Sequence, residues 1–242
     1  MLIPFKSRSI LAVPTPLQLL VRETMFDEGP VGTMDLATAI KTNRTWFDLK
    51  AVAGAEIEGP LLEAEREGFA RRSGDSLELL RGGRVALVLA AMNMGISSEQ
   101  AVQCLGPREF EDLVSRLLQA HSFKVMTRVR VRNRSGWAEF DVVGWRKPRA
   151  VFPDCKRWPR RAVYGAPCRS QRERVQAWGL TALRKMGAEG RAAKAFPVVT
   201  TVIPGVERVV EGCLLVGFDK LNSAISKVTD GFFDQDSLRF EL

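Results

Sequence analysis

Apolar residues change their spacing near residue 121, and this change decides what the second half of the chain can fold into. Between residues 107 and 121 they recur at intervals of three and four, as on one face of a helix. These residues are Phe110, Leu113, Val114, Leu117, Leu118 and His121. From residue 123 onward apolar residues alternate with polar ones, as in strands. The pattern predicts a helix over 107–121, then strands over 123–132, 137–145 and 150–158.

The remainder of the second half returns to a mixture of helix and strand. A basic loop over 159–169 leads to a helix, whose expected inner face carries Gln171, Val175, Trp178, Ala182 and Met186. Strands are expected over 198–203 and 213–218, and a further helix over 221–228. The resulting order, αβββαβ, indicates an α/β fold.

Residues 1–105 are expected to form a separate, mainly helical domain. Thr15-Pro16 begins a helix that Gly29 ends, because Pro is favoured at the first helical position and Gly after the last. Further helices are predicted near 34–41, 45–53, 60–68, 85–94 and 97–105, with a hairpin over 69–80. Short helices followed by a hairpin favour a winged helix, and the alternative is a helical cap on the second domain. Gly106-Pro107 marks the boundary, so the predicted domains are 1–105 and 106–242.

Lys and Arg are concentrated in one segment. Residues 124–174 contain 15 Lys and Arg against four Asp and Glu, a local charge of +11, while the remaining residues contain 21 against 24. Clustered cations displace condensed counterions from a phosphate backbone, so the segment predicts DNA as a partner. The alternative is an ordinary solvated basic surface.

Several classes of protein are disfavoured by what the 242 residues lack. A single His and the absence of a CxxC pair argue against a standard zinc site. No GxxxxGK[ST] loop is present, so no nucleotide cofactor is expected. The longest apolar run, 85–92, is far shorter than the roughly 20 residues that cross a bilayer. The N-terminus does not resemble a secretory signal, so we expect a cytoplasmic protein with reduced thiols.

Three charged residues on the second and third predicted strands form the most informative pattern. Asp154 and Lys156 are two positions apart and therefore share a face, while Cys155 points the other way. A hairpin turning at Lys147-Pro148 brings Asp141 alongside Asp154. Two carboxylates suit a hard divalent cation, and the lysine would lie near its bound water. The alternative, a surface salt bridge, is less favourable because Asp154 lies in an apolar strand, where an unpaired charge is costly.

The ordered series of motifs resembles the active site of the PD-(D/E)xK nuclease superfamily. The series comprises Phe110-Glu111, Glu139-Phe-Asp141, Asp154-Cys-Lys156-Arg157-Trp158 and Gln171. It is most similar to the Mrr-type restriction endonucleases and the archaeal Holliday-junction-resolvase-like proteins, over about residues 107–218. One departure is the Asp at position 154, where Glu is more frequent. The resemblance implies a restriction-endonuclease-like core and a phosphodiesterase that uses Mg²⁺ or Mn²⁺.

The resemblance also implies a role for each matching residue. The implied metal ligands are Asp141, Asp154, Glu111 and the backbone carbonyl of Cys155. Lys156 would orient or deprotonate the attacking water and stabilise charge on the phosphate. Gln171 would point toward the sheet, and Glu139 would support the site from the same strand as Asp141. The alternatives are a solvated helix glutamate for Glu111 and simple polarity at a helix N-terminus for Gln171.

Residues next to the motif lysine are expected to contact DNA: Arg157, Trp158, Arg160, Arg161, Arg169 and Arg172. Trp158 would stack on bases or, alternatively, anchor its loop. The sequence thus predicts a metal-dependent DNA endonuclease of the restriction or repair type. The alternative is a DNA-binding or complex-forming subunit that keeps the fold without turnover. A homodimer partner or a repair or restriction complex is a further expected partner.

Overall fold

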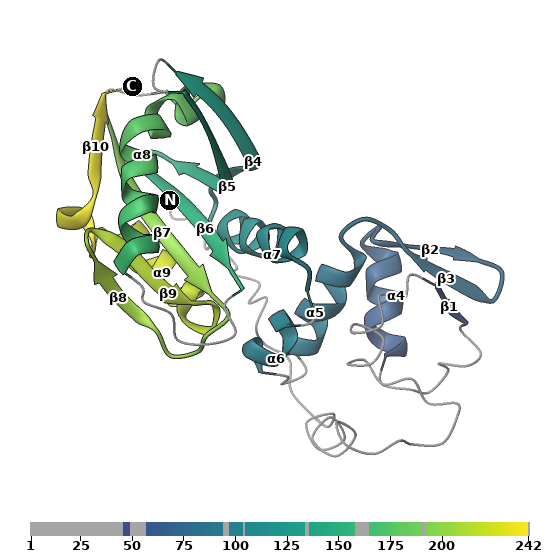
Figure 1. Cartoon of the computed structure of the whole chain (residues 1–242). Helices are drawn as coiled ribbons and strands as arrows, with labels where there is room; N and C mark the ends of the chain where they lie inside the picture. Colours follow the sequence, from purple (N-terminus) through teal and green to yellow (C-terminus); the bar gives the residue numbers. More distant parts are fainter. Residues whose placement is uncertain are drawn as a thin grey trace, which may run out of the picture. The chain divides into compact units, whose positions relative to one another are not determined.

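The computed structural model describes residues 46–48, 57–93, 97–103, 105–133, 136–157, 165–189 and 192–241. The chain divides into two compact units, Met1–Leu105 and Gly106–Leu242 (Figure 1). Within the described ranges, no helix is both long enough and apolar enough to cross a membrane. The helices predicted over 15–29 and 34–41 lie outside these ranges.

The first unit contains a small antiparallel sheet and helices. Its elements are β1 (Trp46–Asp48), α4 (Glu58–Arg66), β2 (Ala70–Ser73), β3 (Ser76–Leu79), α5 (Gly83–Asn93) and α6 (Ser98–Gln103). The strand order is β1-β3-β2, and β2 and β3 form the predicted hairpin. The helix predicted over 45–53 is wrong at residues 46–48, which pair with β3 as a strand, because aromatic residues favour strands and a ladder is available. The winged-helix topology stays a prediction, since it depends on helices before residue 46.

A mixed sheet forms the centre of the second unit (Figure 1). Its strands are β4 (Lys124–Asn133), β5 (Gly136–Arg146), β6 (Arg149–Lys156), β7 (Ala192–Thr201), β8 (Glu207–Val210), β9 (Cys213–Gly217) and β10 (Leu238–Glu241). The order is β4-β5-β6-β7-β9-β8, and β10 pairs with the first part of β7. Strands β6, β7 and β9 run parallel, whereas β4, β5 and β6 form antiparallel pairs. The predicted α/β class is therefore confirmed.

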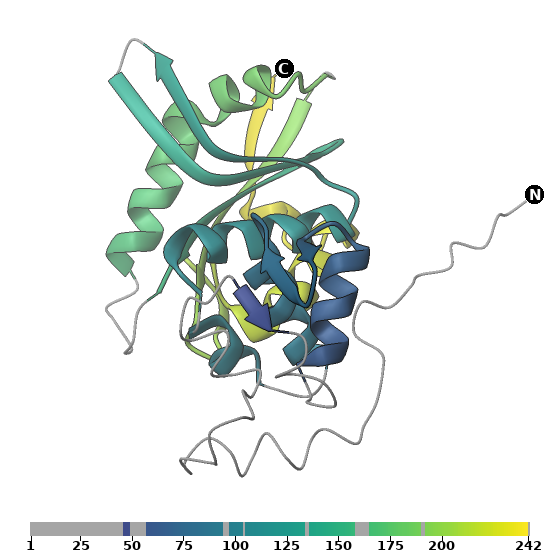
Figure 2. The ribbon, with the colours of Figure 1, turned by 90° about the vertical axis from the view of Figure 1, so that its right-hand side faces the viewer.

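Three helices cover the two faces of this sheet: α7 (Pro107–Ala120), α8 (Gly165–Lys185) and α9 (Phe218–Asp230) (Figures 1 and 2). The core between α8 and the sheet includes Val129, Val131, Phe140, Phe152, Val175, Ala182 and Leu183. On the opposite face, Gly144 lies against Leu118 of α7. Phe110 of α7 contacts Phe218 of α9 edge to face, with ring centroids 5.7 Å apart. Strand residues that face α8 therefore belong to a different layer from those that face α7.

Some predicted boundaries were wrong. Helix α8 begins at Gly165, inside the predicted basic loop, because Pro167 is tolerated in the first turn of a helix. Strand β7 begins at Ala192 rather than 198, because parallel pairing with β6 extends through Lys194 and Ala195. Strands β8 and β10 were not predicted at all. Each has four residues and is held by pairing with a distant strand, which a local pattern does not reveal.

Candidate active site

Strands β5 and β6 separate soon after the turn that joins them. Their ladder pairs only residues 144–146 with 149–151; beyond it β5 stays with β4, while β6 stays with β7. Side chains replace the missing ladder bonds. The amide of Cys155 donates to Oδ2 of Asp141 at 2.8 Å, and Nε2 of Gln171 donates to the carbonyl of Phe152 at 2.8 Å. We call this opening between β5 and β6 the fork.

Asp154 lies at the fork on the face covered by α8. Its side chain is only 5% exposed, and both carboxylate oxygens have cationic partners: Nζ of Lys156 at 3.0 Å and Nη1 of Arg174 at 3.4 Å. A buried carboxylate is costly unless it is paired in this way. The same Arg174 donates to Oε1 of Gln171 at 3.0 Å. Sequence reasoning missed Arg174, although it follows Gln171 by one helical turn.

Asp141 faces the fork from β5. Burial raises the pKa of its carboxyl, the Cys155 amide opposes that rise, and the neighbouring charge of Asp154 adds to it. Burial therefore makes the ionised form of Asp141 costly, whereas Asp154 has two cationic partners within 3.4 Å. A bound cation would remove that cost.

Glu111 approaches the same region from α7. Its carboxylate lies 3.4 Å from Nη1 of Arg128, and Nη2 of the same guanidinium lies 3.0 Å from Asp112. Arg128 interrupts β4 with a left-handed backbone, φ 53°. Burial first, and the charge of Asp141 second, raise the pKa of Glu111 to about 7. The structure therefore places Glu111 within the electrostatic reach of Asp141.

The oxygen donors at the fork suit a hard cation, although the set is small. In the described part of the chain, no group of three or more His, Cys, Asp or Glu side chains is placed to hold a metal ion. Mg²⁺ commonly takes only one or two carboxylates and keeps several waters. Asp141 and Asp154 supply two carboxylates of that kind, and burial raises the pKa of Asp141. These residues are compatible with the implied metal.

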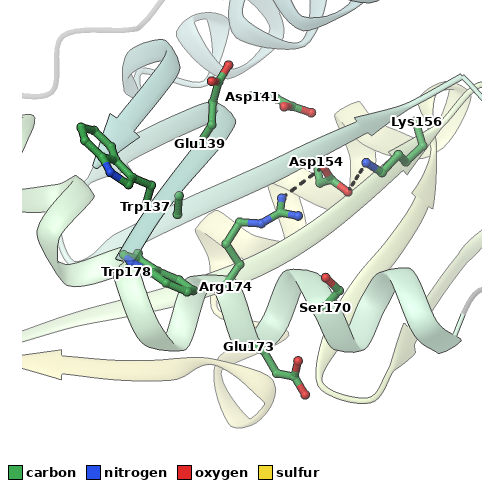
Figure 3. A pocket seen from close by; sticks show the side chains of 10 residues that line it. Trp137, Glu139, Asp141, Asp154, Lys156, Ser170, Glu173, Arg174 and Trp178 are labelled. Carbon is green, nitrogen blue, oxygen red and sulfur yellow. Dashed lines mark hydrogen bonds and ion pairs between the residues drawn. The ribbon is translucent and has the colours of Figure 1, made fainter. Parts of the chain in front are cut away.

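A pocket of about 540 Å³ extends from the fork along α8 (Figure 3). Asp141, Asp154 and Lys156 line one part of it, and Trp137 and Trp178 line the other (Figure 3). Glu139 is also at its rim, where it forms a 2.7 Å salt bridge with Arg130. Sequence reasoning did not single out Trp137. Residues two apart on a strand share a face, so the spacing between Trp137 and Glu139 could have indicated that Trp137 lies beside the site.

The residues expected to contact DNA are spread over several places. Arg169 forms a two-point contact with the carboxylate of Glu211 at 3.0 and 2.7 Å, and Arg172 donates to the Glu211 carbonyl at 3.1 Å. These contacts join α8 to the turn between β8 and β9, and neither arginine lines the pocket of Figure 3. Arg157 directly follows β6. Trp158, Arg160 and Arg161 lie outside the described residues.

Replacing Glu111 by Gln should flatten the pH dependence of stability in metal-free protein. The folded chain holds a proton on Glu111 that the unfolded chain releases between the ordinary pKa of 4.5 and the raised value of about 7. Stability contributed by this group is therefore lost as pH rises through that window. Urea denaturation of both proteins across the window measures the difference. Parallel curves for the wild type and Glu111→Gln would contradict the prediction.

No protein-family model matches the chain, and neither does any curated protein. Among solved structures, it is similar to AF1548, a protein of unknown function, with 23% identity over 40% of this chain and 47% of that chain, at a TM-score of 0.30. It is also similar to VC1899 from Vibrio cholerae, with 17% identity, coverage of 82% and 49%, and a TM-score of 0.33. A third is Can2 from Sulfobacillus thermosulfidooxidans in complex with cyclic tetra-adenylate, with 16% identity, coverage of 82% and 50%, and a TM-score of 0.32. The chain spans about half the length of these structures, and likenesses this low assign neither a family nor an activity.

Proposed function

We propose that the second unit is a metal-dependent nuclease that hydrolyses phosphodiester bonds in DNA. The observation that carries this proposal is the convergence of Asp141, Asp154 and Lys156 on one pocket at the fork. The charge of the surrounding segment, +11 over residues 124–174, supports a polyanionic substrate. The order of elements and motifs supports a place in the PD-(D/E)xK superfamily.

Each residue at the fork has a distinct part in this proposal. Asp141 and Asp154 would hold Mg²⁺ or Mn²⁺, with the Cys155 carbonyl and Glu111 as further oxygen donors. Such an ion, when bound, stabilises charge on the phosphate and acidifies a water molecule. Lys156, with its Nζ 3.0 Å from Asp154, would orient the attacking water and stabilise the developing negative charge.

Gln171 and Arg174 act as positioning residues in this proposal. Gln171 is 1% exposed and bonds the Phe152 carbonyl on the strand that carries Asp154. Arg174 links the Gln171 amide to the Asp154 carboxylate. Together they fix the orientation of Asp154 from α8, so that its carboxylate faces the pocket.

A second candidate is a DNA-binding subunit without turnover. The observation that favours it is the pairing of both Asp154 oxygens with Lys156 and Arg174, which satisfies this carboxylate without a metal. Such a subunit would use the basic segment for DNA and act with a second copy or a repair or restriction complex.

Cleavage assays on the purified full chain separate the two candidates. Single-stranded, duplex and branched DNA are each incubated with Mg²⁺ or Mn²⁺, and parallel samples contain excess EDTA. The nuclease proposal expects cleavage of at least one substrate, and expects EDTA to stop it, because the carboxylates act through the metal. DNA binding without cleavage of any substrate supports the second candidate. Undiminished cleavage in EDTA contradicts the metal mechanism.

A further inference from the structure

We propose that the indole of Trp137 stacks on an unpaired nucleobase beside a phosphate bound at Lys156, so that this pocket takes single-stranded DNA in preference to duplex. The inference rests on the proposed function for the identity of the polymer. It adds the substrate class and a residue that selects it.

Trp137 is an unusually exposed aromatic residue at the rim of the pocket. Its side chain is 68% exposed, although it lies on β5 within the second unit. Arg132, its partner across the β4–β5 ladder, holds its guanidinium carbon 5.3 Å from the centre of the ring. The indole is thus held by a cation and still leaves most of its surface open. Exposed indoles next to cations are typical of sites where bases stack.

The pocket has the volume and the lining of a site for one nucleotide and its phosphate. Figure 3 shows Lys156 and Asp154 toward one end and Trp137 and Trp178 at the other, with Arg174 between them. Its volume of about 540 Å³ lies within the usual range for small-ligand pockets. A phosphate near Lys156 would therefore place an adjoining base toward the two indoles.

Duplex DNA does not offer a base in this way. Its bases are paired and stacked inside the helix, and exposing one costs a few kcal/mol per base. In a single strand the face of the base is already available, and stacking on an aromatic side chain tolerates any sequence. A stacking residue beside the carboxylates therefore discriminates by strandedness and not by sequence.

Binding by full-length variants in EDTA tests the inference without cleavage. Trp137→Ala, Trp137→Phe and the control Phe232→Ala are compared with the wild type on a labelled oligothymidylate strand and on a blunt duplex of equal length. Phe232 is 71% exposed and does not line the pocket, so it is a matched exposed aromatic. Loss of one stacked base should weaken single-strand binding by Trp137→Ala about 5- to 150-fold. Trp137→Phe should retain most of the affinity, and Phe232→Ala and duplex binding should change little.

Tryptophan fluorescence gives a second measurement. DNA would not change the emission of Trp137 if this residue only supported the fold. Oligothymidylate should quench the wild-type emission, and Trp137→Ala should lose that part of the quenching because the stacked indole is gone. Single-strand binding that is unchanged in Trp137→Ala, or a loss that is equal on duplex, would overturn the inference.

The outcomes also distinguish this inference from the proposed function. If the wild type cleaves DNA with Mg²⁺ but Trp137→Ala binds single strands normally, the inference fails and the nuclease proposal stands. If single-strand binding depends on Trp137 but no DNA is cleaved with Mg²⁺ or Mn²⁺, the nuclease proposal fails and the inference stands.

Discussion

Lys156→Ala should lower the rate of DNA cleavage by at least about 10², the lower range for losing a general acid–base or charge-stabilising group. The substitution removes the ammonium that lies 3.0 Å from Asp154 and lines the pocket, but leaves Arg174 as a partner of that carboxylate. DNA affinity should change little, because Lys156 is one of 15 basic residues in the segment 124–174. The measurement is the cleavage rate and the dissociation constant of one preparation at one stated salt concentration.

Lys220→Ala provides the matched control for this prediction. Lys220 is exposed on α9 and its loss changes the net charge by the same amount. Its cleavage rate should equal that of the wild type. If Lys156→Ala also cleaves at the wild-type rate, Lys156 is not the motif lysine and the nuclease assignment of β6 is wrong. Under the binding-subunit candidate, there is no cleavage to lose, and Lys156→Ala only weakens affinity.

Asp141→Asn should lower turnover by a factor of at least about 10². The variant should bind DNA as well as the wild type or better. The substitution removes a negative charge that would face the phosphate and hold the metal. It keeps an oxygen that can accept the Cys155 amide, which donates to Asp141 at 2.8 Å. Because burial and Asp154 raise the pKa of Asp141, loss of its charge should not destabilise metal-free protein.

Asp141→Ala separates the charge from the hydrogen bond. It removes both, so it should lose cleavage as Asp141→Asn does and should also be less stable, because the Cys155 amide loses its acceptor. Cleavage rates, dissociation constants and urea denaturation of the two variants are the measurements. Wild-type cleavage by Asp141→Asn would show that this carboxylate is not required for the reaction.

Much of the fork could be predicted because it depends on local patterns. The apolar face of α7 carries Phe110, Leu113 and Val114 inward, as its spacing predicted. The hairpin of β5 and β6 pairs Gly144 with Val151, and this register would set Asp141 opposite Asp154 if it continued; the ladder ends at Gly144 instead, and Asp141 accepts the Cys155 amide. The short hairpin predicts that these two carboxylates lie near one another, but not that the strands separate between them.

Other parts of the site depend on contacts between distant segments, which a local pattern does not contain. The approach of Arg174 to Asp154 requires the placement of α8 on the sheet. The left-handed backbone of Arg128 shifts the inward face of β4, so that Met126 packs on the same core as Val129 three positions later. Simple alternation would have placed those two side chains on opposite faces.

The replacement of ladder bonds by side chains at the fork has a consequence for genetics. Asp141 and Gln171 each satisfy a backbone group of β6, the Cys155 amide and the Phe152 carbonyl, in addition to any part in the reaction. A screen that scores only loss of function will therefore group alleles that unfold the protein with alleles that remove only the proposed activity. Separation-of-function alleles at these positions must keep the shape and the hydrogen bond of the native side chain, as Asp141→Asn does. At Lys156, whose contact at the fork is an ion pair with Asp154, a simple truncation is the more informative allele.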